Sequence, residues 1–284
     1  MVGLRLRWLA ALVSAVALVA VAGPAHAAGD HGSGGQRYYL SLGDSLAFGF
    51  QRAKALAGLP PSAFDTGYAN LLADRLDHGR RRPALVNYGC PGESTASFLA
   101  GPCPWTAGGR ALHDAFTGPQ KDAALAFLRD HRGRVDLVTL SLWGNDANAF
   151  VASCQGDVRC IRDGAPAAIA AIAANLSTIL GEIRRTAPDA TVVLLGAVDV
   201  NIGAFELTHP LIRALNAAMA DVATAHRARF ANPFPIFNPE GDTGAALCTL
   251  TLLCTDGDAH PSDAGYRAIA DLIEEQLKQP GPHR

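Results

Sequence analysis

Ser45 is the first residue whose type and setting point to chemistry. It follows a short apolar run, residues 38–42, and stands in Gly43-Asp44-Ser45-Leu46, a turn-forming cluster at the end of a predicted strand. In open α/β sheets, ligands bind at the carboxyl ends of strands. We therefore hypothesise that Ser45 is a nucleophile, although the cluster taken alone is more typical of an ordinary surface turn.

Two further strand ends and a histidine offer what a nucleophilic serine needs. The predicted strand 84–88 ends in Gly89-Cys90-Pro91-Gly92, whose glycines allow close backbone approach and expose N–H groups. The predicted strand 135–142 is followed by Trp143, Gly144 and Asn145, and the asparagine offers a side-chain N–H₂ donor. His260 stands just before the last predicted helix, with acids two and four residues upstream.

These blocks together resemble the SGNH hydrolases, also called GDSL esterases and lipases, a family named for a serine, a glycine, an asparagine and a histidine in four blocks. Here Gly-Asp-Ser-Leu holds Ser45, Asn-x-Gly-x-x-Gly holds Gly89, Gly-Asn-Asp holds Asn145, and His-Pro holds His260. One block alone is unspecific, but the four occur in the family's order over residues 38–270. Asn-x-Gly-Cys-Pro-Gly-Glu and paired cysteines make the resemblance closest to secreted actinobacterial members.

The resemblance implies a role for each of these residues. Ser45 would attack an ester carbonyl, and His260 would take its proton and return it to the leaving alcohol. The backbone N–H groups of Ser45 and Gly89 and the side chain of Asn145 would bind the oxyanion. No metal-ligand spacing, phosphate-binding glycine loop or dinucleotide motif occurs in the sequence, so we expect no cofactor and no metal.

The acid that orients the histidine departs from the family pattern. The family usually places it three residues before the histidine, where this chain has Gly257. We expect Asp258 to reach His260, with Asp256 or a backbone carbonyl near Gly257 as alternatives, since orientation needs only an acceptor for the imidazole N–H.

Two apolar features near these blocks have open interpretations. Trp143 stands where the family commonly has a small residue, and it either lines an acyl pocket or packs in the core. The segment 247–254 is either a buried loop or a wall of an acyl-binding groove. A second His-Pro pair, at His209, has no cluster of acids beside it, and we interpret it as structural or substrate-adjacent.

The elements that would position these residues alternate between strand and helix, as in a doubly wound fold. We predict a flavodoxin-like, three-layer α/β/α single domain over residues 38–279, with a parallel sheet of about five strands. Apolar, largely β-branched runs predict strands at 38–42, 84–88, 135–142, 191–198 and 229–231, and helical spacing predicts helices at 68–77, 120–129, 166–186, 209–226 and 262–278.

The N-terminus reads as a secretory signal peptide. Arg5 and Arg7 precede an apolar run, which ends in an Ala-x-Ala site, so we predict cleavage after Ala27 and a flexible lead-in over residues 28–37. We expect a secreted protein without stable membrane insertion. The net charge of −2 and the absence of a basic stripe make nucleic acid an unsuitable partner, and we expect a monomer.

Six cysteines occur as three close pairs, Cys90 and Cys103, Cys154 and Cys160, and Cys248 and Cys254. Six cysteines allow 15 connectivities. Because the destination is oxidising, we predict that each pair forms a disulfide. A zinc site, the alternative, would need Cys-x-x-Cys spacing with histidines nearby.

The sequence therefore predicts a secreted serine hydrolase that cleaves lipid or other acyl esters. A carbohydrate esterase that removes acetyl groups is one alternative, and a catalytically inactive secreted binding module is another. The size of the acyl pocket separates the first two, and sequence does not give it.

Overall fold

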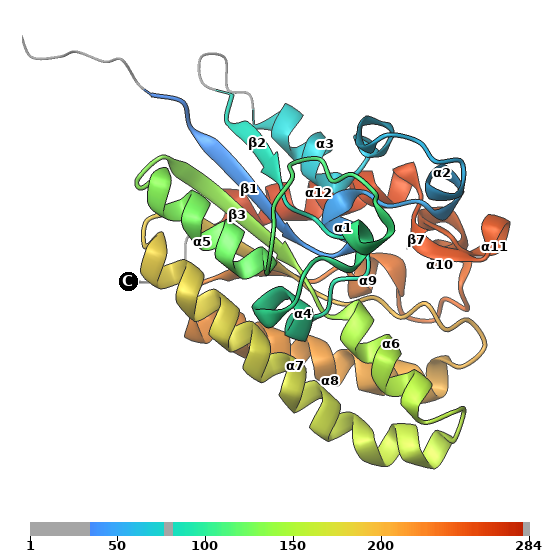
Figure 1. Cartoon of the computed structure of the whole chain (residues 1–284). Coiled ribbons are helices and arrows are strands. Elements are labelled where there is room, and N and C mark those ends of the chain that lie inside the picture. Colours follow the sequence, from blue (N-terminus) through green and yellow to red (C-terminus); the bar gives the residue numbers. More distant parts are fainter. Residues whose placement is uncertain (1–34, 77–81, 281–284) are drawn as a thin grey trace, which may run out of the picture. The chain divides into compact units, whose positions relative to one another are not determined.

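A parallel five-stranded sheet forms the centre of the part of the chain that the computed structural model describes, residues 35–76 and 82–280 (Figure 1). Its strand order is β2-β1-β3-β4-β5. This is the predicted doubly wound, flavodoxin-like order. The strands are β1 Tyr38–Gly43, β2 Ala84–Asn87, β3 Val135–Ser141, β4 Thr191–Leu195 and β5 Arg229–Ala231. The predicted signal peptide, residues 1–27, and most of the lead-in lie outside the described residues.

Helices cover both faces of this sheet (Figure 1). Alternate strand residues point to opposite faces. Leu40, Val138 and Leu194 therefore pack with one group of helices, mainly α5, α7 and α8, and Tyr39, Val193 and their neighbours pack with another, mainly α3 and α12. The helices are α1 Ser45–Phe48, α2 Arg52–Leu56, α3 Tyr68–Arg75, α4 Thr95–Ala100, α5 Gln120–Asp130, α6 Gly144–Ser153, α7 Val158–Thr186, α8 Phe205–Ala225, α9 Phe234–Phe237, α10 Ala245–Leu250, α11 Leu253–Asp256 and α12 Asp263–Lys278, with 3₁₀ helices at Pro61–Phe64 and Pro104–Gly108.

The helices differ from the predictions in several places: α8 begins at Phe205, four residues before its predicted start, and the short helices α1, α2, α4, α9, α10 and α11 were not predicted. Helix α7 begins at Val158, eight residues before the predicted start, and runs through Pro166; Asp157 caps it by accepting the Arg159 N–H at 2.8 Å. Helix α6 was not predicted, because its sequence has no apolar stripe. Among the described residues, α7 alone has the length and hydropathy to cross a membrane, and one of its faces packs in the core.

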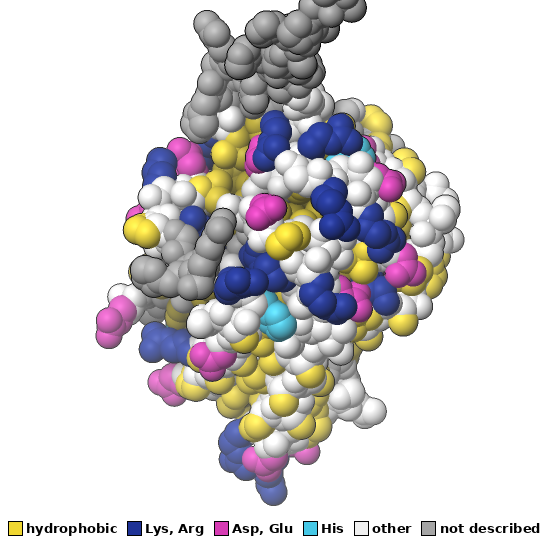
Figure 2. Space-filling model, turned by 90° about the vertical axis from the view of Figure 1, so that its left-hand side faces the viewer, with side chains coloured by type: hydrophobic (Ala, Val, Ile, Leu, Met, Phe, Trp, Pro, Cys, Tyr) yellow, Lys and Arg dark blue, Asp and Glu magenta, His cyan; other side chains and the backbone are white. Residues whose placement is uncertain are grey.

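The position of the site follows from the sheet. The strand order reverses between β1 and β3, and in open α/β sheets ligands bind outside the carboxyl ends of the strands at such a switch point. A small antiparallel pair, β6 Thr251–Leu252 with β7 Asp258–Pro261, carries His260. The opposite edge, at the amino ends of the strands, carries interspersed basic and acidic side chains (Figure 2).

Candidate active site

Ser45 is the first residue of α1, at the point where β1 ends. Asp44 caps this helix: its Oδ1 accepts the Leu46 N–H at 2.9 Å and the Ser141 Oγ–H at 3.2 Å. Gly43 has a φ of +125°, and a Cβ there would lie 1.9 Å from the carbonyl oxygen of Ser141. Only glycine fits this turn, so the turn places Ser45 at the edge of the sheet.

A histidine and a carboxylate lie in line with the serine. The Oγ of Ser45 lies 2.9 Å from Nε2 of His260, and Nδ1 of His260 lies 2.6 Å from Oδ1 of Asp258. Asp258 and His260 are two residues apart in strand β7, where alternate residues share a face. The side chain of Asp256 is exposed. Of the acceptors considered for the imidazole, the structure thus places Asp258 against it.

The Asp258 carboxyl is held as an anion although it is only 4 % exposed. Its Oδ2 accepts the backbone N–H of Arg52 at 2.7 Å. Burial raises the pKa of Asp258, but the hydrogen bonds from His260 and Arg52 outweigh burial and hold the pKa at about 2. A charged acceptor therefore faces the imidazole at every pH near neutrality.

The segment that follows α1 makes hydrogen bonds to β7, the strand that carries His260, and to α12. Gln51 Nε2 donates to the carbonyl oxygen of Pro261 at 3.2 Å, and the hydroxyl of Tyr266 donates to the carbonyl oxygen of Phe50 at 2.8 Å. The ring of Phe50 lies 4.6 Å from that of His260. These contacts join residues more than 200 positions apart, and no local sequence pattern signals them.

The expected oxyanion donors differ in whether their N–H groups already have hydrogen-bond acceptors. Asn145 lines the same cavity as Ser45, and one hydrogen of its Nδ2 goes to the carbonyl oxygen of Glu93 at 2.8 Å, which leaves a second N–H. The Gly89 N–H donates to Oδ1 of Asn87 at 2.9 Å. Ser45, Asn145 and His260 therefore meet at one cavity, whereas the N–H of Gly89 is engaged elsewhere.

Gly89 also has a packing role that the sequence did not indicate. A Cβ at Gly89 would lie 2.4 Å from the backbone nitrogen of Phe48 and 2.7 Å from the carbonyl carbon of Ala47. The side chain of Asn87 holds the same contact by donating to the carbonyl oxygen of Ala47 at 2.9 Å. The loop after β2 thus lies directly on the backbone of the serine helix.

The loops after β2 and β3 are tied together on the other side of Asn145. Asp146 accepts the N–H of Thr95 at 2.8 Å and its hydroxyl at 2.6 Å, and Asn175 Nδ2 donates to the same hydroxyl oxygen at 2.9 Å. Asn145 is therefore held through its side chain and through its neighbour in the chain.

Two buried carboxyls lie behind the serine. Burial raises the pKa of Asp44 to about 6, against the lowering effect of the Leu46 N–H and the Ser141 hydroxyl. Burial also raises the pKa of Glu93 to about 7, and the nearby charges of Asp44 and Asp146 add to the rise.

A cavity of about 460 Å³ opens beside Ser45 and His260. Its walls are mostly apolar and come from α6, α7, α8 and the end of β4, with Phe150, Val151, Ile161, Ala165, Ala168, Ile169, Val198, Leu207, Leu211 and Leu215 among them. A volume of this size is typical of pockets that enclose small organic ligands.

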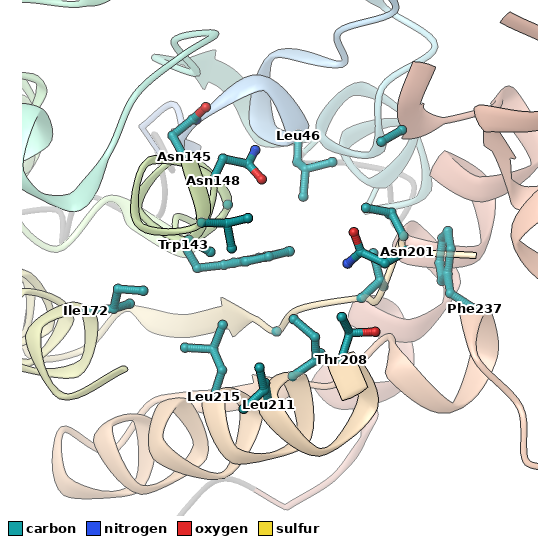
Figure 3. Close-up of a pocket in the computed structure, with 18 of the residues that line it drawn as sticks. Leu46, Trp143, Asn145, Asn148, Ile172, Asn201, Thr208, Leu211, Leu215 and Phe237 are labelled. Atoms are coloured by element: carbon teal, nitrogen blue, oxygen red, sulfur yellow. The ribbon is translucent and has the colours of Figure 1, made fainter. Parts of the chain in front are cut away.

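Trp143 lines this cavity and also packs against the core. Figure 3 shows its indole ring between Asn148 of α6 and the leucines Leu211 and Leu215 of α8. The segment 247–254 contributes only Thr251 to the cavity wall, and Leu247 is fully buried. The segment consists of the end of α10, strand β6 and the start of α11, and only Leu247 and Thr251 in it are buried, so it is neither a buried loop nor a main wall of the cavity.

The six cysteines form the three predicted sequential disulfides, Cys90–Cys103, Cys154–Cys160 and Cys248–Cys254. Among them, Cys90–Cys103 closes the loop after β2, and Cys248–Cys254 spans β6. His209 is not among the residues that line the cavity: its ring stacks on Phe205, and its Nε2 is 3.6 Å from Oδ2 of Asp199.

Solved structures with this fold include several ester hydrolases. Phospholipase A1 from Streptomyces albidoflavus NA297 is 17% identical, with a TM-score of 0.58 over 85% of this chain and 100% of that one. A lipase from a goat rumen metagenome is 16% identical, with a TM-score of 0.56 over 85% and 97% of the two chains. The acetylxylan esterase Axe2 from Geobacillus stearothermophilus is 16% identical, with a TM-score of 0.54 over 86% and 95%. No curated protein matches the sequence.

The sheet order and the serine at its carboxyl edge define an α/β hydrolase of the SGNH fold. The model of the GDSL-like Lipase/Acylhydrolase family matches residues 41–268, a range that holds Ser45, Gly89, Asn145, Asp258 and His260. The chain belongs to this family and is a carboxylic ester hydrolase.

Proposed function

We propose that this protein is a secreted lipase or esterase that hydrolyses esters of longer acyl chains through an acyl-serine intermediate. The apolar cavity of about 460 Å³ beside Ser45 is the observation that carries this proposal. An acetyl group would occupy only a small part of it. The Ser45–His260–Asp258 hydrogen-bond chain supports the covalent mechanism.

In the first half of the reaction, the Oγ–H proton of Ser45 passes to Nε2 of His260 while Oγ bonds to the ester carbonyl carbon. The resulting oxyanion faces the Ser45 N–H and the remaining N–H of Asn145; a donor of this kind is typically worth about 3–4 kcal/mol of barrier. Collapse breaks the bond to the alcohol oxygen, which takes the proton from His260. Water then repeats the sequence on the acyl-serine and releases the acid.

Asp258 has a supporting role in each step. Its Oδ1 accepts the Nδ1–H of His260, so Nε2 carries the free lone pair and receives the serine proton. The carboxylate also stabilises the imidazolium that forms when the proton arrives.

The acyl chain would lie along α7 and α8 in the apolar part of the cavity. Each buried methylene contributes about 0.8 kcal/mol, which is roughly a fourfold gain in kcat/KM. The gain continues along the chain until the cavity is full. Activity should therefore rise from acetate to esters of medium or long chains.

A series of p-nitrophenyl esters from acetate to dodecanoate tests this proposal. Ala168 lines the cavity from α7, whereas Ala170 is exposed on the same helix. We expect Ala168→Phe to lower kcat/KM at least tenfold for the long esters and to change acetate less than about twofold. The control Ala170→Phe should leave the whole series unchanged.

A carbohydrate deacetylase of the same fold is the alternative. The acetylxylan esterase, which shares this fold, is the reason to consider it. Activity confined to acetate and indifferent to Ala168→Phe would establish that alternative. The covalent mechanism has its own test in Ser45→Ala: we expect a loss of at least ~10³-fold, and equal activity of the variant would refute it.

Secretion is proposed on two grounds, the predicted signal sequence and the three disulfides, which are typical of oxidising compartments. An extracellular lipase from Streptomyces rimosus also shares the fold. Protein recovered from the medium should begin at Ala28. Retention in the cells with an intact N-terminus would contradict this part.

A further inference from the structure

Gln120 lies fully buried behind the nucleophile turn, residues 43–45. The sequence gives it no role beyond the start of a helix. Its Oε1 accepts the N–H of Gly43 at 2.7 Å, and its Nε2 donates to the carbonyl oxygen of Gly43 at 2.9 Å. Strand β2 ends at Asn87, paired with Ser41, so it does not reach the N–H of Gly43. Beyond the end of β2, the Cys90 N–H still donates to the carbonyl oxygen of Gly43 at 2.9 Å. The amide of Gln120 adds the acceptor for the Gly43 N–H and a second donor to that carbonyl oxygen.

Glu93 fixes the direction of this amide. The second hydrogen of Gln120 Nε2 goes to Oε2 of Glu93 at 3.1 Å, and Oε1 of Glu93 accepts the hydroxyl of Ser97. A carboxyl oxygen favours the N–H₂ end of the amide, so Gln120 must present its oxygen to the N–H of Gly43. Glu93 is fully buried, and its described partners include no cation. Such a group is costly to bury.

The backbone of Glu93 holds the other half of the site. Its carbonyl oxygen accepts Nδ2 of Asn145 at 2.8 Å. One residue therefore orients both the amide that clamps the nucleophile turn and the asparagine that faces the oxyanion.

We propose that Gln120 and Glu93 form a positioning pair that sets Ser45 relative to Asn145. The inference rests on the proposed acyl-serine mechanism, because it assigns the pair to the geometry of that step. The pair touches neither substrate nor reacting atoms. Its contribution should therefore be seen in kcat and in the reactivity of Ser45, and not in KM.

The chain offers a matched control in Asn216, a second buried amide with the same two contacts. Its Oδ1 accepts the N–H of Ala197 at 2.7 Å and its Nδ2 donates to the carbonyl oxygen of Ala197 at 2.9 Å, just past the end of β4. Neither Asn216 nor Ala197 lines the cavity. Loss of this clamp should cost similar stability without moving the nucleophile.

The experiment compares Gln120→Met and Asn216→Leu in the mature protein with p-nitrophenyl butyrate, a fluorophosphonate that labels Ser45, and thermal melting. A misplacement of about 1 Å can cost a hundredfold in rate. We expect Gln120→Met to lower kcat and the labelling rate by about 10- to 100-fold, with KM within about twofold. Asn216→Leu should melt at a similarly lowered temperature with kcat within about threefold of wild type.

A third variant, Glu93→Met, leaves Gln120 in place and removes the acceptor that orients it. We expect this variant to lower kcat at least about fivefold. The double variant with Gln120→Met should have a kcat no lower than that of the less active single variant, because the two residues act as one unit. If Gln120→Met does not fold, this variant decides alone.

Two results would overturn the inference. One is kcat within about threefold of wild type in Gln120→Met or, where that variant does not fold, in Glu93→Met. The other is an equal loss of kcat in Asn216→Leu, which would make the effect one of general stability. Failure of the proposed mechanism is distinct, since the wild-type Ser45 would then escape labelling altogether.

Discussion

Replacement of Asp258 by asparagine disturbs the site in a way that the structure lets us follow atom by atom. Oδ1 of Asp258 accepts from Nδ1 of His260 at 2.6 Å, and Oδ2 accepts the N–H of Arg52 at 2.7 Å. Both oxygens of the carboxylate are therefore acceptors in use. An amide has one acceptor and one donor, so Asp258→Asn forces one donor against another.

The clash has a chemical consequence at His260. If the amide oxygen stays with Arg52, the N–H₂ faces Nδ1 and forces the proton onto Nε2, where it blocks transfer from Ser45. If the oxygen stays with His260, the backbone N–H of Arg52 loses its acceptor and the strand shifts. The first outcome places the imidazole in the wrong tautomer, for which a loss of about 10⁴-fold in kcat is typical. We expect a loss of at least 10³-fold, which is about 4 kcal/mol of barrier.

The same replacement changes stability, with a sign fixed by the pKa. Because the pKa of Asp258 falls from 3.8 to about 2 on folding, its stabilising contribution is present above pH 3.8 and is lost as the pH falls through 2. A shift of this size is worth about 2 kcal/mol at pH 7. The unfolding free energy of Asp258→Asn should therefore lie below that of wild type at pH 7, and the difference should shrink below pH 4.

Steady-state hydrolysis of p-nitrophenyl butyrate at pH 7 measures the loss, and denaturant unfolding at the same pH confirms that the variant is folded. The control is Asp256→Asn, because the Asp256 side chain is exposed and only its backbone carbonyl is used, by Arg52. It should retain wild-type activity. An Asp258→Asn variant within threefold of wild type, or an equal loss in the control, would refute the assignment of Asp258.

Three further predictions concern the parts around this chain of residues. Gly89→Ala should lower both activity and melting temperature, because its Cβ would meet the backbone of Phe48 at 2.4 Å and overpacking typically costs about 1–3 kcal/mol; wild-type values in both assays would contradict the packing. Glu93, whose pKa burial raises to about 7, stabilises the fold at low pH and loses that contribution as the pH rises through 7; wild type should lose up to about 3 kcal/mol more than Glu93→Gln between pH 4.5 and 8, as denaturant unfolding will show. Cys248→Ser should lower kcat more than Cys154→Ser, although both disulfides have a sequence separation of 6 and so similar loop entropy; equal kcat values would count against a positioning role.

The sheet was predictable because its strands are buried on both faces and therefore occur as short apolar runs. All five predicted strands exist, and their ends differ from the predicted ones by at most three residues. Helix α6 was not predicted, since its first turn is polar and its packing depends on α7. Pro166 looked like a helix start, but α7 begins a full two turns earlier, where Asp157 caps it.

The site was predictable in composition and only partly in geometry. Ser45 and Asn145 follow strand ends and His260 lies in β7 just before α12, each within a recognisable sequence block. The carboxyl edge of the sheet brings them together. Gln120 was not predictable, because a glutamine at a helix start is typical of a solvated surface. The engaged N–H of Gly89 is equally invisible in sequence, since it depends on the side-chain rotamer of Asn87.

The unusual position of the acid follows from the backbone that carries the histidine. In an extended strand the residue that shares a face with position i is i−2, so Asp258 reaches His260 because β7 is extended. That extension depends on pairing with β6, where Thr251 lies opposite Pro261 and Leu252 opposite Asp258. β6 is in turn enclosed by the Cys248–Cys254 disulfide, which joins the helices on either side of it. The family's usual position is occupied here by Gly257, which has a φ of +61° and ends α11. An aspartate there would be strained and would point away from the strand face. The position of the acid therefore depends on the disulfide-closed segment. That segment contains β6, β6 pairs with β7, and the extended β7 places the acid two residues before His260.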